Sequence, residues 1–227
     1  MTPSQLEAEI YRHWDFSDPA ASRLVFQRRA EAAPDEVTAA IWRTQEARTL
    51  GLLDQFDDAE ALLARVESTM SAPSEGADQE HLQARVAIER GRILNSGGNP
   101  ALALRHFDDA FEHAQRAGTE GLAVDALHMR AIAEGALGGP ENSRPWNERA
   151  LAMAEASTDP NARRWRGSLL NNLGWDHLDA GDPSSALELF EAALAERRLT
   201  GNAELIKHAE DAVAEAQAVL GPASTAG

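Results

Sequence analysis

Residues 166–201 read RGSLLNNLGWDHLDAGDPSSALELFEAALAERRLTG, and the pattern within them decides the fold. Leu173 follows Leu169 and Leu170 by four and three residues, which places the three side chains on one face of a helix. Asp182 and Pro183 signal the start of a second helix, because a cap carboxylate accepts hydrogen bonds from free first-turn amides and proline has its φ already set. The stretch therefore predicts two helices joined by a short turn.

Small residues in both helices indicate that they pack closely. The second helix carries a stripe of Ala186, Phe190 and Ala193. Gly174 lies inside the first helix, where glycine costs about 1 kcal/mol relative to alanine. Close approach of the second helix would explain this cost, so we expect a helical hairpin.

This hairpin resembles the tetratricopeptide repeat, whose signature places large, small and aromatic residues at fixed positions along two helices. Counting from Gly167, six of the eight signature positions match, and His177 and Arg198 replace the remaining aromatic and proline. The matching residues are Leu170, Leu173, Gly174, Ala186, Phe190 and Ala193.

The same pattern recurs along the chain at a longer interval than in the basic repeat. The small residue of the signature falls at Ala47, Gly91, Ala131 and Gly174, so neighbouring repeats are 40 to 44 residues apart. The basic repeat spans about 34 residues. The chain thus resembles the longer-helix variants found in kinesin light chains and in Rap-type peptide receptors.

The resemblance implies an all-α fold, a right-handed α-α superhelix (solenoid) of about five helical hairpins plus a C-terminal capping helix. We expect one domain over residues 1–220 and a disordered tail at 221–227. The first pair has Ile10 where a small residue is expected, so it is interpreted as a degenerate repeat or an N-terminal cap. The predicted hairpins cover residues 2–33, 35–70, 77–117, 121–156 and 161–199, and the capping helix covers 202–220.

Composition limits the partners. The chain has 37 acidic and 21 basic residues, a net charge of -16, which argues against nucleic acid because phosphate backbones require a basic footprint. The acidic charge favours either basic partners or simply solubility. No apolar run reaches membrane-spanning length and the N-terminus lacks a signal peptide pattern, so we expect a cytoplasmic protein with no membrane contact.

Sequence motifs give no indication of an enzyme. Phosphate loops, dinucleotide fingerprints, HExxH and nucleophile elbows are missing from the sequence, and so is cysteine. His106, Asp109 and His113 could share a helix face in a metal-binding arrangement, but they fall on a second helix, which faces outward in the resembling family. We therefore predict no catalytic residue, no metal and no cofactor.

In the resembling family the first helices of successive repeats line a concave groove. Carried over position by position, the resemblance gives these candidates for a peptide-binding groove: Arg48, Arg85, Arg92, Asp125, His128, Asn171, Asn172, Trp175 and Asp179. Arg48 and Arg92 occupy the same position of adjacent repeats and could hold an acidic side chain or a C-terminal carboxylate. The alternative is that Arg92 pairs with Glu89, three residues earlier.

Three further candidates also allow two interpretations each. Asn171 and Asn172 resemble the asparagines with which kinesin light chains hold a peptide backbone, since an amide side chain both donates and accepts. Hydrogen bonding between repeats is the alternative for this pair. Trp175 is either a binding anchor or a packing residue.

The sequence thus predicts a non-enzymatic scaffold that holds an unidentified protein or peptide segment in its concave groove. The alternative is a self-assembling structural protein made of repeat units, such as a homodimer.

Overall fold

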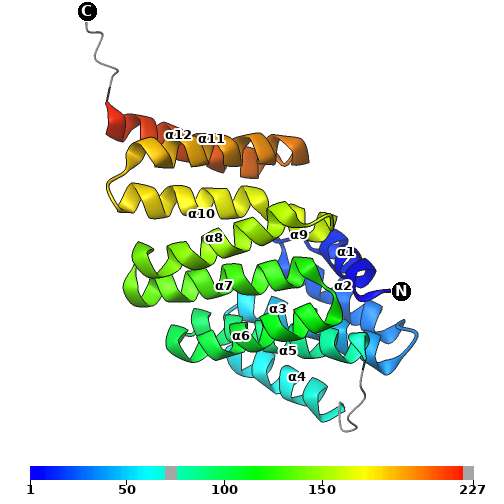
Figure 1. The fold of residues 1–227 in the computed structure, drawn as a ribbon. Helices are drawn as coiled ribbons and strands as arrows, with labels where there is room; N and C mark the ends of the chain where they lie inside the picture. Colours follow the sequence, from blue (N-terminus) through cyan, green and yellow to red (C-terminus); the bar gives the residue numbers. More distant parts are fainter. Residues whose placement is uncertain (70–75, 222–227) are drawn as a thin grey trace, which may run out of the picture.

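The computed structural model describes residues 1–69 and 76–221, and every regular element within them is a helix. The predicted all-α solenoid of stacked hairpins is confirmed (Figure 1). The helices are α1 (Pro3–His13), α2 (Pro19–Glu31), α3 (Glu36–Leu52), α4 (Phe56–Thr69), α5 (Ala77–Ser96), α6 (Pro100–Ala117), α7 (Glu120–Gly138), α8 (Pro140–Ala156), α9 (Pro160–Arg163), α10 (Arg166–Asp179), α11 (Pro183–Thr200) and α12 (Ala203–Leu220).

Helix starts follow the cap-and-proline signal read from the sequence. Asp182 accepts a hydrogen bond from the backbone amide of Ser185 at 3.2 Å, and Pro183 is the first residue of α11. Asp18 does the same for the amide of Ala21 at 2.9 Å at the start of α2. Each cap satisfies an amide that has no partner within its helix.

Two hairpins pack a phenylalanine ring against a glycine. Phe190 of α11 lies over Gly174 of α10, and Phe107 of α6 lies over Gly91 of α5. A Cβ atom added at either glycine would lie closer than 3.0 Å to ring atoms of the facing phenylalanine. The close packing predicted at Gly174 is therefore present, and it recurs at α5 and α6.

The hairpins stack in chain order. The pairs α3–α4, α5–α6, α7–α8 and α10–α11 lie side by side, and α12 packs on α11 at the red end of Figure 1. The short helix α9 stands between α8 and α10 and contacts both α7 and α8. The prediction of one hairpin over residues 161–199 did not include this separate one-turn helix at its start.

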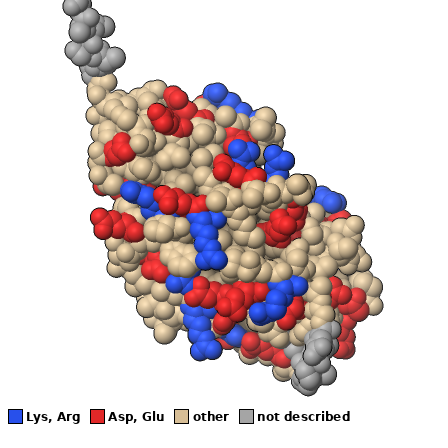
Figure 2. Space-filling model, in the orientation of Figure 1, with Lys and Arg blue, Asp and Glu red and all other residues tan. Residues whose placement is uncertain are grey.

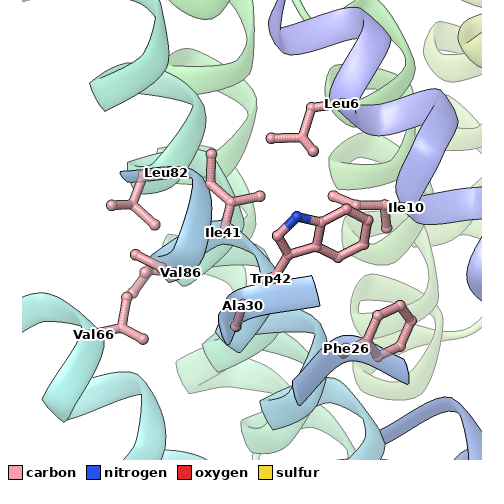
Figure 3. Packing of buried hydrophobic residues seen from close by; sticks show 10 residues of the cluster. Leu6, Ile10, Phe26, Ala30, Ile41, Trp42, Val66, Leu82 and Val86 are labelled. Carbon is pink, nitrogen blue, oxygen red and sulfur yellow. The ribbon is translucent and has the colours of Figure 1, made fainter. Parts of the chain in front are cut away.

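Helix α1 departs from the hairpin pattern. The sequence predicts one hairpin over residues 2–33, but α1 touches α5, α7 and α9 as well as α2. Its side chains Leu6 and Ile10 lie in a core cluster with Ile41 and Trp42 of α3 (Figure 3). Helix α2 packs along α3 rather than along α1. Helix α1 therefore lies across α5 and α7, the first helices of later hairpins.

Within residues 1–69 and 76–221, no helix has the length and apolar character needed to cross a bilayer. The end of the hairpin predicted at 35–70 and nearly all of the tail predicted at 221–227 lie outside the described residues.

Candidate functional site

Helix α1 crosses the face on which the groove candidates lie. At one end the Ser4 hydroxyl donates to the Asp159 carboxylate at 2.9 Å, and the Asn161 amide donates to the Ser4 carbonyl at 3.0 Å. At the other end the indole of Trp14 donates to Oε1 of Gln45 on α3 at 3.0 Å. The helix therefore runs from α9 to α3, and it passes α7 and α5 on the way.

A buried carboxylate fixes the middle of α1. Glu7 is 2% exposed, and its Oε1 accepts from Nε of Arg85 at 2.7 Å while its Oε2 pairs with Nη2 of the same guanidinium. The His81 ring lies 2.6 Å from Oε1 through Nε2. Burial by itself raises the pKa of Glu7, but Arg85 and His81 outweigh it and lower the pKa to about 2. Glu7 is therefore ionised at neutral pH.

The ion pairs continue from α5 to α7. Arg92 donates through Nη1 to Glu89 at 2.6 Å and through Nη2 to both carboxylate oxygens of Asp125 at 2.6 Å. Nη1 of Arg85 lies 3.6 Å from Glu89. Burial raises the pKa of Asp125, but Arg92 lowers it below its ordinary value overall. The pairing of Arg92 with Glu89, left open by the sequence, is the arrangement in the structure.

Arg48 is close to this ion-pair network but makes no pair within it. Its guanidinium has no hydrogen bond or ion pair with any described residue, and its Nε is buried without an acceptor. It lies 5.1 Å from the centre of the Trp14 ring and 5.2 Å from that of Phe16. Burial, followed by the positive charge of Arg92, lowers the pKa of Arg48 to about 10, so it remains protonated at neutral pH.

A cavity of about 420 Å³ opens in front of Arg48. Residues of α1 and the following segment form one part of its wall, with the rings of Tyr11, Trp14 and Phe16. Trp165 and the first residues of α12 form another part of the wall. The charged residues lining the cavity are Arg48, Arg85, Asp125, Arg164 and Glu204, the last of which is exposed at α12.

Arg164, which follows α9, is a second cation without an acidic partner. Its guanidinium lies 3.9 Å from the centre of the Tyr11 ring, and its Nη1 donates to Oδ1 of Asn161 at 3.4 Å. Among the described residues no carboxylate is within ion-pair distance of it. Burial lowers its pKa below the ordinary value of arginine.

His128 and Asn172 connect two repeats beside the cavity. Nδ2 of Asn172 on α10 lies 3.3 Å from Nδ1 of His128 on α7, and the His128 ring lies 5.2 Å from that of Trp165. Burial lowers the pKa of His128 to about 4, so its ring is neutral at neutral pH and can accept from the amide. The Asn172 side chain thus bonds between repeats, which is one of its two interpretations.

The remaining candidates lie away from the cavity. Trp175 packs edge-on against Phe190, with 5.1 Å between ring centres. Asp179 is exposed at the end of α10, and Asn171 is partly buried on the same helix. Of the nine groove candidates, the structure brings Arg48, Arg85 and Asp125 to the cavity wall and places Arg92 directly behind Asp125.

Sequence reasoning missed the part of the wall that α1 supplies. None of Tyr11, Trp14, Phe16, Arg164 and Trp165 is among the nine groove candidates, yet all five line the cavity. One signal was available, because Glu7 stands beside Leu6 and three residues before Ile10 on one helix face. A carboxylate within an apolar stripe requires a buried cation elsewhere in the chain.

Comparisons with known proteins agree with this architecture. Residues 125–198 match the family model of the tetratricopeptide repeat. No curated protein matches the chain. Among solved structures, BtubC (BKLC) from P. vanneervenii is similar with a TM-score of 0.68 and 16% identity, covering 93% of this chain and 84% of that one.

Two further structures carry the repeats that the sequence resembles. Kinesin light chain TPR-like repeats from Podospora anserina give a TM-score of 0.56 at 19% identity, over 79% of this chain and 85% of theirs. A Rap protein complexed with Competence and Sporulation Factor gives 0.67 at 12% identity, over 93% of this chain but only 63% of the Rap protein. At these identities the likeness shows a shared fold. Residues 125–198 thus match the tetratricopeptide repeat, and the chain as a whole shares the helical solenoid fold of the kinesin light chain and Rap structures.

Proposed function

We propose that the protein is a non-enzymatic scaffold that holds a segment of a partner protein or peptide in the cavity on its concave face. The tetratricopeptide fold commonly mediates protein interaction through such a surface. The observation that carries the proposal is Arg48, a protonated guanidinium at the cavity wall with no acidic partner among the described residues. A partly buried cation of this kind is stabilised when a partner supplies an acceptor.

The position of α1 limits where the segment binds. Helix α1 contacts the first helices α5 and α7, and Glu7 pairs with Arg85 of α5, so that part of the face is already occupied. The open part lies between the end of α1 and the first turns of α10 and α12. Its volume of about 420 Å³ is within the usual range for ligand pockets, roughly 300 to 1,000 Å³.

The acidic residues at the site are held in ion pairs, which favours a binding role over catalysis. Both oxygens of Asp125 accept from Arg92, and both oxygens of Glu7 accept from Arg85. Carboxylates held in this way have lowered pKa values, which makes them poor proton acceptors at neutral pH. They stabilise the wall of the cavity.

The test is a selection from a displayed peptide library, repeated with an Arg48→Gln variant. Arg105→Gln is the matched control, because Arg105 of α6 is 87% exposed. We expect peptides selected by the native protein to bind Arg105→Gln equally and Arg48→Gln about tenfold more weakly or worse. Equal binding by Arg48→Gln, with an unchanged helical spectrum, would place the binding surface elsewhere and overturn the proposal.

The alternative of a self-assembling homo-oligomer has a separate test. Large exposed apolar side chains in the described residues, such as Leu24, Leu102 and Leu199, are distributed over α2, α6 and α11. On the face shown in Figure 2, acidic and basic side chains are interspersed. A stable dimer by light scattering at micromolar concentration would favour the alternative. The cytoplasmic location expected from the sequence stays a prediction.

A further inference from the structure

We infer that the cavity recognises a carboxylate carried on an apolar group, with the guanidinium groups of Arg48 and Arg164 as its cationic contacts. This inference rests on the proposed function, since it specifies the chemistry that the same cavity accepts.

The charges around the cavity leave one cation in excess. Arg85 and Arg92 are paired with Glu7, Glu89 and Asp125. Arg48 and Arg164 bring the guanidinium groups to four, against these three carboxylates. Glu204 also lines the cavity, but it is exposed on α12, where solvent screens its charge. The buried part of the site therefore suits a ligand with a single negative charge.

The two guanidinium groups without a carboxylate partner lie near aromatic rings, and apart from the bond from Nη1 of Arg164 to Asn161 they make no hydrogen bond with a described residue. Trp14 and Phe16 stack on each other with ring centres 4.7 Å apart, and Arg48 lies near both. Arg164 lies over Tyr11. A guanidinium that uses its face against a ring keeps its N–H edge for a planar acceptor, and a carboxylate matches that edge.

The apolar residues of the cavity wall indicate what kind of group the carboxylate is attached to. Ile10, Trp165 and Leu205 line the cavity together with the aromatic rings of residues 11–16. Leu205 is 37% exposed, so a ligand that covers it removes apolar surface from water. The buried Nε1 of Trp165 has no acceptor among the described residues and is a further donor near the site. An apolar or aromatic group next to the carboxylate fits this wall.

Two kinds of ligand carry a carboxylate next to an apolar group: the C-terminus of a protein that ends in an apolar residue, and a free organic acid. We would therefore titrate the full-length protein with 3-phenylpropionate and with the tripeptide Ala-Ala-Phe, each as the acid and as the amide. Calorimetry measures the affinity, and a change in tryptophan fluorescence that is lost in a Trp14→Phe variant shows that the ligand enters the cavity. We expect the acids to bind at least about tenfold more tightly than the amides. Tighter binding of the tripeptide acid would identify a protein C-terminus, and tighter binding of 3-phenylpropionate a free acid.

Arginine variants then assign the contacts. Arg48→Gln and Arg164→Gln should each weaken binding of the acid by about tenfold and leave binding of the amide unchanged, whereas Arg105→Gln should change neither. The inference is overturned if both acids fail to bind below about 10 mM, if the amides bind as well as the acids, or if both variants bind like the native protein. The comparison of acid and amide needs only the native protein, so a variant that fails to fold does not prevent the test.

The two proposals fail separately. If library peptides still depend on Arg48 while the acids and amides do not differ, the scaffold proposal stands and the carboxylate inference falls. If neither depends on Arg48, both fall.

Discussion

At the scale of single residues, the least expected feature is the carboxylate of Glu7. It is buried between two helices, yet it stays charged because Arg85 and His81 surround it. Removing one member of a buried ion pair is costly, because the remaining charge loses both its partner and access to water. Glu7 therefore holds α1 to α5 more firmly than a surface carboxylate would.

Glu7→Gln should lower the free energy of unfolding by about 3 kcal/mol, measured by urea denaturation at neutral pH. Glu9→Gln is the matched control on the same helix, where the carboxylate is 29% exposed and pairs with Arg12 at 2.9 Å. That change should cost less than about 1 kcal/mol. Similar losses in the two variants would show that the Glu7 ion pair adds nothing beyond a surface contact.

The same residue predicts a pH dependence. The folded-state pKa of Glu7 is about 2, below its ordinary value of 4.5, so its contribution is fully present above pH 4.5. That contribution is lost as the pH falls from 4.5 toward 2, because the unfolded chain then binds the proton more readily. The stability difference between the native protein and Glu7→Gln should be constant from pH 7 to about pH 5 and shrink below it. A difference that is independent of pH down to 3 would contradict the assignment.

At the scale of helices, the hairpins depend on a phenylalanine that packs over a glycine. The ring of Phe190 is fully buried and occupies the space where a Cβ of residue 174 would lie. Helix propensity favours alanine there by about 1 kcal/mol, but overpacking costs about 1 to 3 kcal/mol. The cost of overpacking should exceed the gain in helix propensity, because the buried ring has no room to move.

Gly174→Ala should therefore lower the melting temperature, with a net loss of about 1 kcal/mol. Gly51→Ala is the control, because the nearest atom to its added Cβ is Cγ1 of Ile93 at 3.7 Å, an ordinary contact. Propensity alone should then raise stability by up to about 1 kcal/mol. Calorimetric melts of the two variants that shift in the same direction would contradict this account.

Local patterns predict the helices well because caps, spacing and the glycine position are all short-range signals. Gly174 and Asp182 could be interpreted from their neighbours alone, and the repeat register brought Arg48, Arg85 and Asp125 to one face. Docking of α1 could not be predicted in the same way. Glu7 meets Arg85 across 78 positions of sequence, outside the repeat register, and no local pattern encodes that contact.

The aromatic wall was missed for the same reason. Tyr11, Trp14 and Phe16 belong to no matching repeat, so their place in the cavity follows only from where α1 docks. For Arg92 the repeat register predicted the position of the side chain but not its partner. That partner, Asp125 on α7, depends on how two repeats stack.

At the scale of the whole molecule, neighbouring hairpins support one another, and the two ends differ. Helices α5 and α7 have neighbours on both sides and contact α1 as well, whereas α12 packs against α11 and touches α10. In a repeat array, an end unit lacks one of its interfaces and opens more easily.

Hydrogen exchange measured by mass spectrometry should therefore show α12 exchanging faster than α5 and α7, by about tenfold or more. Peptides from α1 should exchange as slowly as those of α5, since the Glu7 ion pair and the Leu6 contacts hold α1 in place. Exchange of α1 as fast as that of α12 would show that the helix leaves the face in solution.

The path of α1 also determines how the molecule can deform. A solenoid is elastic because each repeat touches only its neighbours, so small rotations add up along its length. Here α1 is bonded to α9 through Ser4 and to α3 through Trp14, and these helices are separated by several repeats. A large rotation of the hairpins between them would have to break those bonds. Elastic bending is left to α10, α11 and α12, so a bound segment would move the C-terminal end of the molecule against a stiff N-terminal half.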